Sequence, residues 1–411
     1  MAVNIVSYPD DWPFTPIGDL ITELRGGAPL KPSDFINTGV KVLPKGGVGR
    51  TGWLRVEDKD LQYCSIEYAG LHHRNSVDET YSIVVLRDLV PSGPSIGLMV
   101  QIKEPERYVL AQGVYGFKLR ANSDPKYLVQ LSNTNWYRKL ANSIMVGSTQ
   151  VHITNTAFKA VQIPLPPLAE QEAIAEALSD TDALIESLDQ LLTKKRLLQQ
   201  GTMQELLTGK KRLPGFCGEW EVKRLGEIAN IQRGASPRPI DNPIWFDENS
   251  NVGWVRISDV TRSGMYLTET LQRLSPLGIE YSRPVANGSL IMSICATVGR
   301  PIITSIDVCI HDGFVVFDDL QADQKFLYYV LAWIEPDWSK HGQTGSQMNL
   351  NTPLINVTPI SFPPLHEQVA IASILSDMDA EITELETQLI KIRSIKQGMM
   401  HKLLTGEIRL I

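Results

Sequence analysis

The sequence has few of the features that mark secreted, membrane-spanning or metal-binding proteins. Its cysteines form no CxxC pair and no spacing typical of metal ligands: Cys64, Cys217, Cys295 and Cys309. We therefore expect reduced thiols in a cytoplasmic protein without a bound metal. No run of about 18 apolar residues is present, so we expect no membrane-spanning helix. The first residues include Asp10 and Asp11 but no apolar stretch, which argues against a signal peptide.

Motifs for catalysis are also missing. No Walker A motif is present, and residues 47–52 match GxGxxG only in letters, because Pro44 precedes them and no amphipathic helix follows. Residues 241–245 (DNPIW) resemble the acidic or amide, Pro-Pro, aromatic box of amino methyltransferases, but the second proline is absent. These absences predict a protein that is not an enzyme and that holds no cofactor.

Positive charge is in short supply as well. The 411 residues include 39 Lys and Arg against 46 Asp and Glu, a net charge of -7. This balance excludes a protein that coats nucleic acid by bulk charge, but it leaves room for a local basic cleft. Residues 1–162 carry 17 Lys and Arg against 15 acids, whereas residues 215–362 carry 11 against 16. The length predicts two or three globular domains.

The most informative feature is an internal repeat. The 48 residues from Pro166 and the 48 from Pro363 align without a gap, and 27 positions are identical. A fainter echo precedes each copy, since Trp12 and Arg25-Gly26 align with Trp220 and Arg233-Gly234. The chain is therefore a tandem duplication of a variable segment and a repeat. We divide it into a first variable segment (1–162), a first repeat with linker (163–214), a second variable segment (215–362) and a second repeat (363–411).

Each repeat predicts one long helix, over about 168–208 and 365–405. Pro-Pro opens each helix, and Gly209 or Gly406 suits the left-handed position after its end. Apolar residues follow the 4-3 alternation of a coiled-coil seam, more regularly in the second repeat. The seam residues are Ile174, Leu178, Ile185, Leu188, Leu192, Leu206, Ile371, Leu375, Met378, Ile382, Leu385, Leu389, Ile392, Met399 and Leu403.

We expect the two helices to pair antiparallel, because both seams need a partner and the other copy is the nearest one. Ordinary amphipathic core helices are the alternative, but each helix is too long for an ordinary domain. Gly201 and Gly398 lie inside the two helices at equivalent positions, where each costs about 1 kcal/mol relative to alanine. Their shared position predicts a close approach of the helices or a bend.

The variable segments are typical of mixed α/β domains in which strands dominate. Short β-rich runs at 81–86, 289–294 and 313–317 are separated by glycine and proline. The fold class is therefore α+β, with two α/β domains and two long helices related by a pseudo-twofold axis.

With no active site in view, recognition of DNA is the remaining function, and it requires cations at phosphates and forked donors at base edges. Loops in both variable segments offer such side chains. The candidates are Arg25, His72, His73, Arg74, Arg138, Lys139, Ser148, Gln150, Arg233, Ser236, Arg238, Arg256, Lys340, His341, Gln343, Ser346, Gln347 and Asn349. For any one of them, a solvated surface residue is the plainer interpretation.

Over its whole length the chain resembles the specificity subunit of type I restriction-modification systems. The motifs that carry this resemblance are PPLAEQ (166–171) with LLTG (206–209), and PPLHEQ (363–368) with LLTG (403–406). Residues 254–259 (WVRISD) and 296–299 (ATVG) are also similar to segments of the family's recognition domains. The first variable segment lacks these two segments.

The resemblance implies a non-catalytic subunit in which two target recognition domains flank an antiparallel pair of spacer helices. Its implied partners are double-stranded DNA with a bipartite asymmetric target, two methyltransferase subunits on the helices, and endonuclease-translocase subunits that join the complex. The alternatives are a DNA-recognition subunit of another multi-subunit modification or defence complex, and a coiled-coil scaffold without a DNA role.

Overall fold

The computed structural model describes residues 8–341 and 350–410, without the side chains of Asp58, Ser339, Lys340 and His341. Its contacts divide the chain into two units, and we describe each by itself. The first unit comprises residues 1–190 together with 387–411, and the second comprises residues 191–386. The first unit is therefore built from both ends of the chain.

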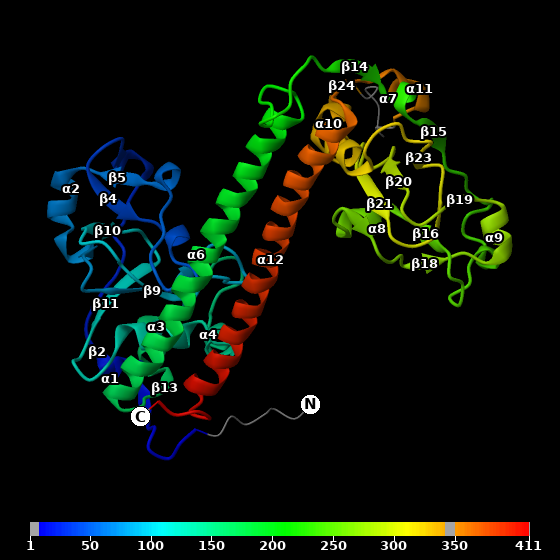
Figure 1. Ribbon diagram of the computed structural model, residues 1–411. Coiled ribbons are helices and arrows are strands. Elements are labelled where there is room, and N and C mark those ends of the chain that lie inside the picture. The colour runs from blue at the N-terminus through cyan, green and yellow to red at the C-terminus, as the bar shows by residue number, and fades with distance from the viewer. Residues whose placement is uncertain (1–7, 342–349, 411) are drawn as a thin grey trace. The chain divides into compact units, whose positions relative to one another are not determined.

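The first unit contains two larger sheets and two pairs of short strands (Figure 1). One sheet has the order β3-β5-β4-β10-β6 and the other β2-β11-β7-β9, while β1 pairs with β13 and β12 with β8. The strands are β1 (Phe14–Pro16), β2 (Ile21–Arg25), β3 (Phe35–Ile36), β4 (Val40–Leu43), β5 (Gln62–Cys64), β6 (Ser76–Val77), β7 (Ser82–Val85), β8 (Arg87–Asp88), β9 (Met99–Gln101), β10 (Tyr108–Leu110), β11 (Val114–Leu119), β12 (Val151–His152) and β13 (Gln162–Pro164).

The second unit repeats this topology. Its sheets have the orders β15-β23-β20-β21-β17 and β18-β16-β22-β19, and β14 pairs with β24. The strands are β14 (Glu221–Arg224), β15 (Asn230–Arg233), β16 (Gly253–Val255), β17 (Tyr266–Leu267), β18 (Gln272–Arg273), β19 (Arg283–Val285), β20 (Leu290–Ser293), β21 (Pro301–Thr304), β22 (Val308–Ile310), β23 (Phe314–Asp318) and β24 (Pro359–Phe362).

Apolar strands form the centre of both units. All four residues of β7 and of β20 are buried, because helices or a second sheet cover both of their faces. The β-rich runs predicted at 81–86, 289–294 and 313–317 are found as β7, β20 and β23. Each unit contains an equivalent parallel pair, β4 with β10 and β16 with β22, and the second unit has a further one, β17 with β21. These pairs confirm the mixed α/β character.

Short helices complete the two units. Those of the first are α1 (Ile17–Leu20), α2 (Ile66–Leu71), α3 (Pro125–Ser132), α4 (Asn135–Ser143) and α5 (Asn155–Ala160), with 3-10 turns η1 (Pro32–Asp34), η2 (Lys45–Gly47), η3 (Asp58–Asp60) and η4 (His73–Asn75). Those of the second are α7 (Leu225–Ile228), α8 (Ile257–Arg262), α9 (Pro276–Glu280), α10 (Gln324–His341) and α11 (Thr352–Val357), with 3-10 turn η5 (Pro243–Trp245).

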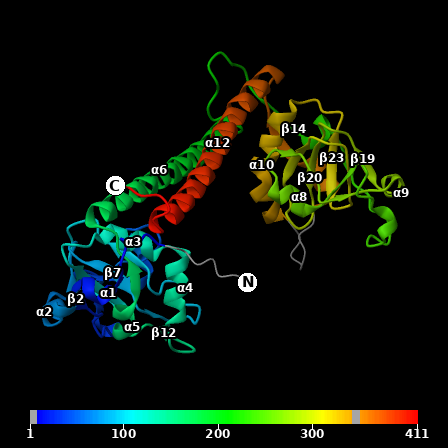
Figure 2. The same ribbon diagram turned by 90° about the horizontal axis from the view of Figure 1, so that it is seen from below.

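Two long helices, α6 (Leu168–Leu206) and α12 (Leu365–Leu404), contribute to both units and lie side by side (Figures 1 and 2). Gly209 and Gly406 follow their ends with φ of 69° and 72°, as the left-handed termination predicts. The predicted helix ranges are therefore confirmed to within two residues.

Ion pairs show that the helices run antiparallel. In the first unit, Lys396 Nζ lies 2.5 Å from Asp182 Oδ1 and Arg393 Nη2 lies 2.7 Å from Asp189 Oδ2. In the second unit, Arg196 Nη2 lies 2.5 Å from Glu386 Oε1. Residue numbers fall on α12 as they rise on α6, so the predicted antiparallel pairing is confirmed.

The fifteen residues proposed for the seam are all buried or half-buried. Not all of them pack helix against helix alone, however. Ile174 and Leu178 belong to the core of the first unit together with Leu403, whereas Leu206 and Ile371 belong to the core of the second unit. The helices are thus part of the domain cores and are not a detached spacer.

The two helix glycines correct one of the two alternatives predicted for them, the close approach, while the bend stays a prediction. Gly201 and Gly398 are exposed, and a Cβ atom added at either position would meet nothing within 4 Å. They mark no close approach between the helices. α6 and α12 also continue through both glycines as helices, so no break occurs there.

The EQ dipeptide at the start of each long helix ties the repeats together. We call the two resulting groups of side chains the clasps. In the first clasp, buried Glu170 accepts hydrogen bonds from Arg409 Nε (2.6 Å) and Nη2 (2.7 Å) and from Trp12 Nε1 (3.2 Å). In the second, buried Glu367 accepts from Arg212 Nε and Nη2, both at 2.7 Å, and from Trp220 Nε1 at 3.1 Å.

Each clasp therefore joins the start of one repeat to the end of the other. Burial alone would raise the pKa of Glu170, but the hydrogen bonds from Arg409 and Trp12 outweigh it and lower the pKa. The neighbouring glutamines act in the same paired way. Gln171 Oε1 accepts from the backbone N–H of Asp124 at 2.9 Å, and Gln368 Oε1 accepts from that of Asp323 at 2.8 Å.

The second clasp generates the first prediction. Replacing Glu367 with alanine removes the buried carboxylate that pairs with Arg212. We therefore expect the free energy of unfolding of the second unit to fall by about 3 kcal/mol. The matched control is Glu381→Ala, which removes the exposed pair with Lys195 and should cost less than about 1 kcal/mol. Urea denaturation measures both variants, and equal losses would contradict the importance given to the clasp.

Candidate nucleic-acid interface

Side chains proposed for DNA contact in the second variable segment converge on one turn, between β22 and β23. Asp312 in this turn accepts a hydrogen bond from Ser236 Oγ at 2.7 Å and pairs with Arg238 Nη2 at 3.0 Å. Its backbone oxygen accepts from Arg233 Nε at 2.7 Å. Three residues predicted from a single loop therefore meet at a residue about 75 positions away, which sequence analysis did not single out. We call this group the Asp312 cluster.

The backbone around the Asp312 cluster is closely packed. A Cβ atom at Gly234 would lie 2.1 Å from the backbone oxygen of His311, so only glycine fits there. Arg283 donates from Nε to the backbone oxygen of Arg233 at 2.6 Å and so holds the end of β15 in place. The cluster therefore presents exposed arginine side chains on a fixed backbone.

The charged neighbours and the burial of Asp312 and His311 shift the pKa values of both residues. Burial alone would raise the pKa of Asp312, but the hydrogen bond from Ser236 and the charge of Arg238 outweigh it and lower the pKa. Burial lowers the pKa of His311, and the nearby charge of Arg256 lowers it further. Arg256, also a candidate, is exposed at the start of α8, where its backbone N–H donates to Asp259.

A cleft of about 670 Å³ lies beside Arg256 in the second unit. Arg273, Gln272, Asp241 and Asp247 also line it, so both signs of charge are present. Within the described part of the chain, Gln272 Oε1 is buried and has no hydrogen-bond partner.

The first unit has an equivalent edge, at the turn between β10 and β11. A Cβ atom at Gly27 would lie 2.0 Å from the backbone oxygen of Ala111, just as Gly234 abuts His311. The backbone N–H of Leu86 donates to Gly113 O, as that of Ile294 donates to Gly313 O. Gln112 therefore stands where the second unit has Asp312.

This equivalence corrects the sequence alignment of the Arg-Gly pairs. Gly27, not Gly26, matches Gly234, because the first unit has one additional residue where the register of β2 against β11 shifts. Arg25 is thus not the counterpart of Arg233. It donates to Glu23 Oε1 at 2.7 Å and to the backbone oxygen of Ser76 at 2.6 Å.

The hairpin that contains residues 147–150 reaches the edge of the first unit. Arg87 Nη2 donates to Gln150 Oε1 at 2.7 Å, while Ser148 is exposed. A cleft of about 410 Å³ beside this pair is lined by Arg87, Tyr115 and His152, among other residues. Arg87 and His152 were missed because neither lies in a recognisable motif.

The turn at 72–75 is joined to the same edge. Asn75 Nδ2 donates to the backbone oxygen of Gly26 at 2.8 Å. His72 is half-buried and stacks on the ring of Tyr68, with ring centroids 4.3 Å apart, whereas His73 and Arg74 are exposed. These contacts leave His73 and Arg74 accessible to a ligand.

Arg138 holds a loop and is not available for DNA. It is only 7% exposed, and its Nη1 and Nη2 atoms donate to the backbone oxygens of Ile96, Gly93 and Pro94 in the loop between β8 and β9. The same loop is tied down by Asp88. Burial alone would raise the pKa of Asp88, but hydrogen bonds from Lys45 and Ser95 outweigh it and lower the pKa to about 2. Lys139, the next residue after Arg138, is exposed.

The second group of candidates in the second unit lies outside the described residues. This holds for the side chains of Lys340 and His341, at the end of α10, and for Gln343, Ser346, Gln347 and Asn349. Their contacts with DNA stay a prediction.

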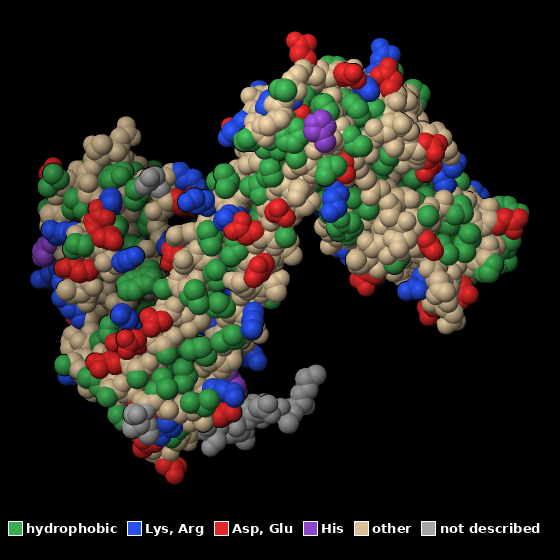
Figure 3. All heavy atoms as spheres, in the orientation of Figure 1, with side chains coloured by type: hydrophobic (Ala, Val, Ile, Leu, Met, Phe, Trp, Pro, Cys, Tyr) green, Lys and Arg blue, Asp and Glu red, His purple; other side chains and the backbone are tan. Residues whose placement is uncertain are grey.

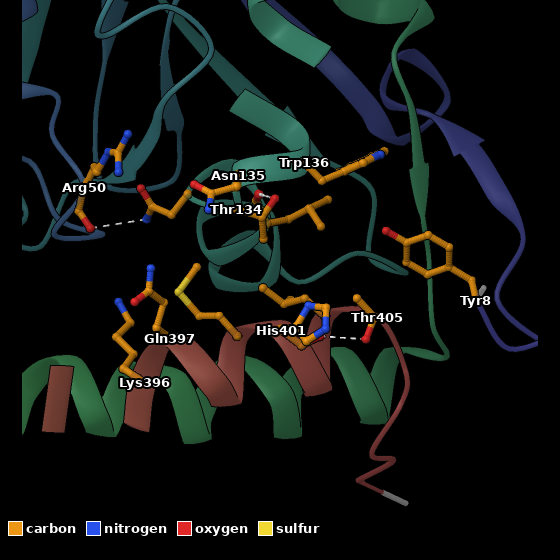
Figure 4. A pocket seen from close by; sticks show the side chains of 13 residues that line it. Tyr8, Arg50, Thr134, Asn135, Trp136, Lys396, Gln397, His401 and Thr405 are labelled. Carbon is orange, nitrogen blue, oxygen red and sulfur yellow. Dashed lines mark hydrogen bonds between the residues drawn. The ribbon is translucent and has the colours of Figure 1, made fainter. Parts of the chain in front are cut away.

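A further cleft of about 280 Å³ lies in the first unit between α4 and the last turns of α12. Figure 4 shows Lys396, Gln397 and His401 on α12 facing Thr134 and Asn135 at the start of α4. Its lining combines these basic and polar side chains with apolar ones such as Trp136 and Met400.

The described residues also bear on the requirements of a metal site and of a membrane-spanning helix. Among them, no group of three or more His, Cys, Asp or Glu is placed to bind a metal ion. No helix in residues 8–341 or 350–410 is long and apolar enough to cross a membrane.

The two units are like scaffolds whose equivalent edges carry unlike polar groups. The family model for the type I restriction modification DNA specificity domain matches residues 9–194 and again 218–393. The chain therefore belongs to the family of type I restriction-modification specificity subunits. The resemblance seen in the repeated motifs is confirmed.

Relatives and solved structures agree with this assignment. The chain is 25% identical over 430 residues to the type I restriction enzyme MjaVIII specificity subunit of Methanocaldococcus jannaschii, covering 98% of this chain and 94% of that protein. It is 22% identical to the EcoKI specificity subunit of Escherichia coli, over 69% of this chain and 65% of that protein. The S subunit structure from M. genitalium has the same fold, with a TM-score of 0.62, 15% identity and coverage of 98% and 97%.

The contrast between Arg138 and Lys139 gives a prediction. Arg138→Ala leaves three loop carbonyls without their donor, so we expect the free energy of unfolding to fall by about 2 kcal/mol. Lys139→Ala, one residue further on the exposed side of α4, should change it by less than about 0.5 kcal/mol. Thermal or urea unfolding measures both variants. Similar stability in the two would show that Arg138 does not anchor the loop.

Proposed function

We propose that this protein reads a bipartite, asymmetric DNA sequence, one half with each unit, for a type I restriction-modification complex. The observation that carries the proposal is the chemical difference between two structurally equivalent edges. The second unit presents arginines around Asp312, and the first presents Arg87, Gln150 and His152 beside Gln112. Unlike donors and acceptors on like scaffolds select unlike base sequences.

The charge distribution fits a reader that works inside a larger complex. On the face shown in Figure 3, basic and acidic side chains are interspersed and no continuous basic tract is visible. Phosphate contacts supply most of the affinity of a protein for DNA, so weak and salt-sensitive binding is expected from this chain alone. A partner that holds DNA itself would supply the rest through linkage. The protein would then act in the cytoplasm, with its DNA.

We further propose that two methyltransferase subunits dock on the long helices. Three exposed positions recur on both helices and share one helix face: Lys194 with Lys391, Leu198 with Ile395, and Gly201 with Gly398. We call each group a helix patch. Leu198 is 55% exposed and Ile395 is 49% exposed.

The helix patches are not explained by the fold of the chain. A glycine inside a helix is destabilising by about 1 kcal/mol relative to alanine, and a Cβ atom added at either glycine would meet nothing within 4 Å. A partner whose backbone approaches closely accounts for both glycines and for the exposed aliphatic side chains beside them. Two equivalent patches fit two copies of one partner. The endonuclease-translocase subunits would join through this complex, and the chain itself would contribute no catalysis.

A segment exchange tests the reading of half-sites. Residues 1–162 are replaced by the equivalent segment of a relative, and the complex is assembled with its methyltransferase subunits. Methylation mapping should show one half of the target changed and the other half retained, because each edge lies within one unit. Exchange of residues 215–362 is the reciprocal control. If either exchange altered both halves, modular reading would be wrong.

A second experiment tests the helix patches. Gly201→Leu places a side chain over one patch and leaves the equivalent patch on α12 intact. We expect the number of bound methyltransferase subunits to fall from two to one, with no loss of stability in the free chain. Native mass spectrometry counts the subunits. Gln200→Leu, an exposed residue that lies about 100° around the helix axis from Gly201, is the matched control. Full occupancy with Gly201→Leu would rule out this docking surface.

A further inference from the structure

The geometry of the Asp312 cluster bears on whether an arginine contacts the phosphate backbone or a base edge of DNA. Arg238 is an exposed arginine of the second unit, with 69% of its side chain accessible. Its side-chain conformation is restricted, because Nη2 is paired with Asp312 Oδ2 at 3.0 Å. Asp312 is in turn fixed by Ser236 Oγ, at 2.7 Å from Oδ1, and by its place in a tight turn.

From this arrangement we infer that Arg238 reads a guanine in the half-site of the second unit, and that Asp312 is the positioning residue that aims it. The inference rests on the proposed function and names the base that one side chain recognises.

Charge separates this role from a contact with phosphate. A phosphate-binding arginine gains most of its attraction from an uncompensated positive charge. The carboxylate of Asp312 cancels the charge of Arg238 at close range, and it would repel a phosphate that approached the pair. The forked N–H donors of the guanidinium remain, since the ion pair occupies only Nη2. The orientation of Arg238 is thereby kept while its own charge is offset, which suits a base edge. Arg233 donates only to the backbone oxygen of Asp312 and keeps its charge.

The chemistry of the bases then selects guanine. In the major groove, guanine presents two acceptors, N7 and O6, whose spacing matches the fork of an arginine. Holding a long side chain in one rotamer before binding also reduces the conformational entropy lost when it contacts the base. The carboxylate of Asp312 holds Arg238 in this rotamer. It cannot itself pair with N7 or O6, because an ionised carboxylate only accepts hydrogen bonds.

The equivalent turn of the first unit lacks this device. Gln112 replaces Asp312, and the residue that matches Arg233 is Gly26. The described residues of the first unit thus offer Gln150 and Gln112 where the second offers an arginine oriented by an acid. The two half-sites would be read by different chemistry, as an asymmetric target requires.

Three variants of the methyltransferase-bound complex test the inference. Arg238→Ala removes the fork, Asp312→Asn keeps an acceptor but removes the charge, and Arg224→Ala is the control. Arg224 is an exposed arginine of β14 in the same unit but in a different sheet. Binding is measured on duplexes that carry each single base-pair change in turn, over a range of salt concentrations.

For Arg238→Ala we expect roughly ten- to hundredfold loss of discrimination at one G·C pair of one half-site. The other half-site and the salt dependence should be unchanged. A duplex with 7-deazaguanine at that position should reproduce the loss with the native complex and add nothing with the variant. For Asp312→Asn we expect weaker discrimination at the same pair, and a salt dependence steeper by about one unit as Arg238 gains access to phosphate.

The opposite pattern would overturn the inference. If Arg238→Ala weakened binding to all duplexes alike and made the salt dependence shallower by about one unit, Arg238 would contact phosphate. No change in either quantity would remove Arg238 from the interface. Failure of the proposed function itself looks different, because the native complex would then show no preferred sequence on any duplex.

Discussion

The fold depends on the two clasps, in which a buried glutamate at the start of one repeat receives an arginine from the end of the other. A carboxylate of low exposure is destabilising unless donors surround it, and each of these has a forked arginine and an indole N–H. Because Trp12 and Trp220 come from the variable segments, the same interaction fixes three parts of the chain at once. The attachment holds the start of each long helix to the end of the other repeat and to the tryptophan that precedes the first strand of a variable segment.

The clasps also explain why two variable segments with unlike surfaces keep the same scaffold. The glutamate, the arginine and the tryptophan of each clasp are repeated, as are the Pro-Pro opening and the glycine three residues before the arginine. The surroundings differ in one contact, because Arg409 also pairs with Asp11 whereas Arg212 donates to the backbone oxygen of Gly218. What faces away from the clasps differs, as Gln112 and Asp312 illustrate. The residues that are the same in both repeats therefore lie near the helices, whereas the residues that differ lie at the edges.

Much of this architecture could be predicted from the sequence, because the relevant signals are local or repeated. Helix ends, the seam and the duplication are visible as spacing, and runs such as 289–294 predict strands. The roles of Arg212 and Arg409 could not be predicted, since their glutamate partners lie 155 and 239 residues away. Arg138 looked like a surface cation because its buried partners are backbone oxygens, which no sequence pattern records. Arg25 was matched to Arg233 because a single extra residue in β2 is invisible to an ungapped alignment.

The division of the chain into units has a consequence for how the protein forms during synthesis. The second unit is one continuous stretch, residues 191–386, whereas the first unit needs residues 387–411 as well. Leu403 and Leu404 are buried in the core that also contains Trp12 and Ile17. A ribosome must therefore release residues 387–411 before the first unit is complete, whereas the second unit needs no residue beyond 386. Loss of residues 387–411 accordingly affects the unit whose synthesis began first.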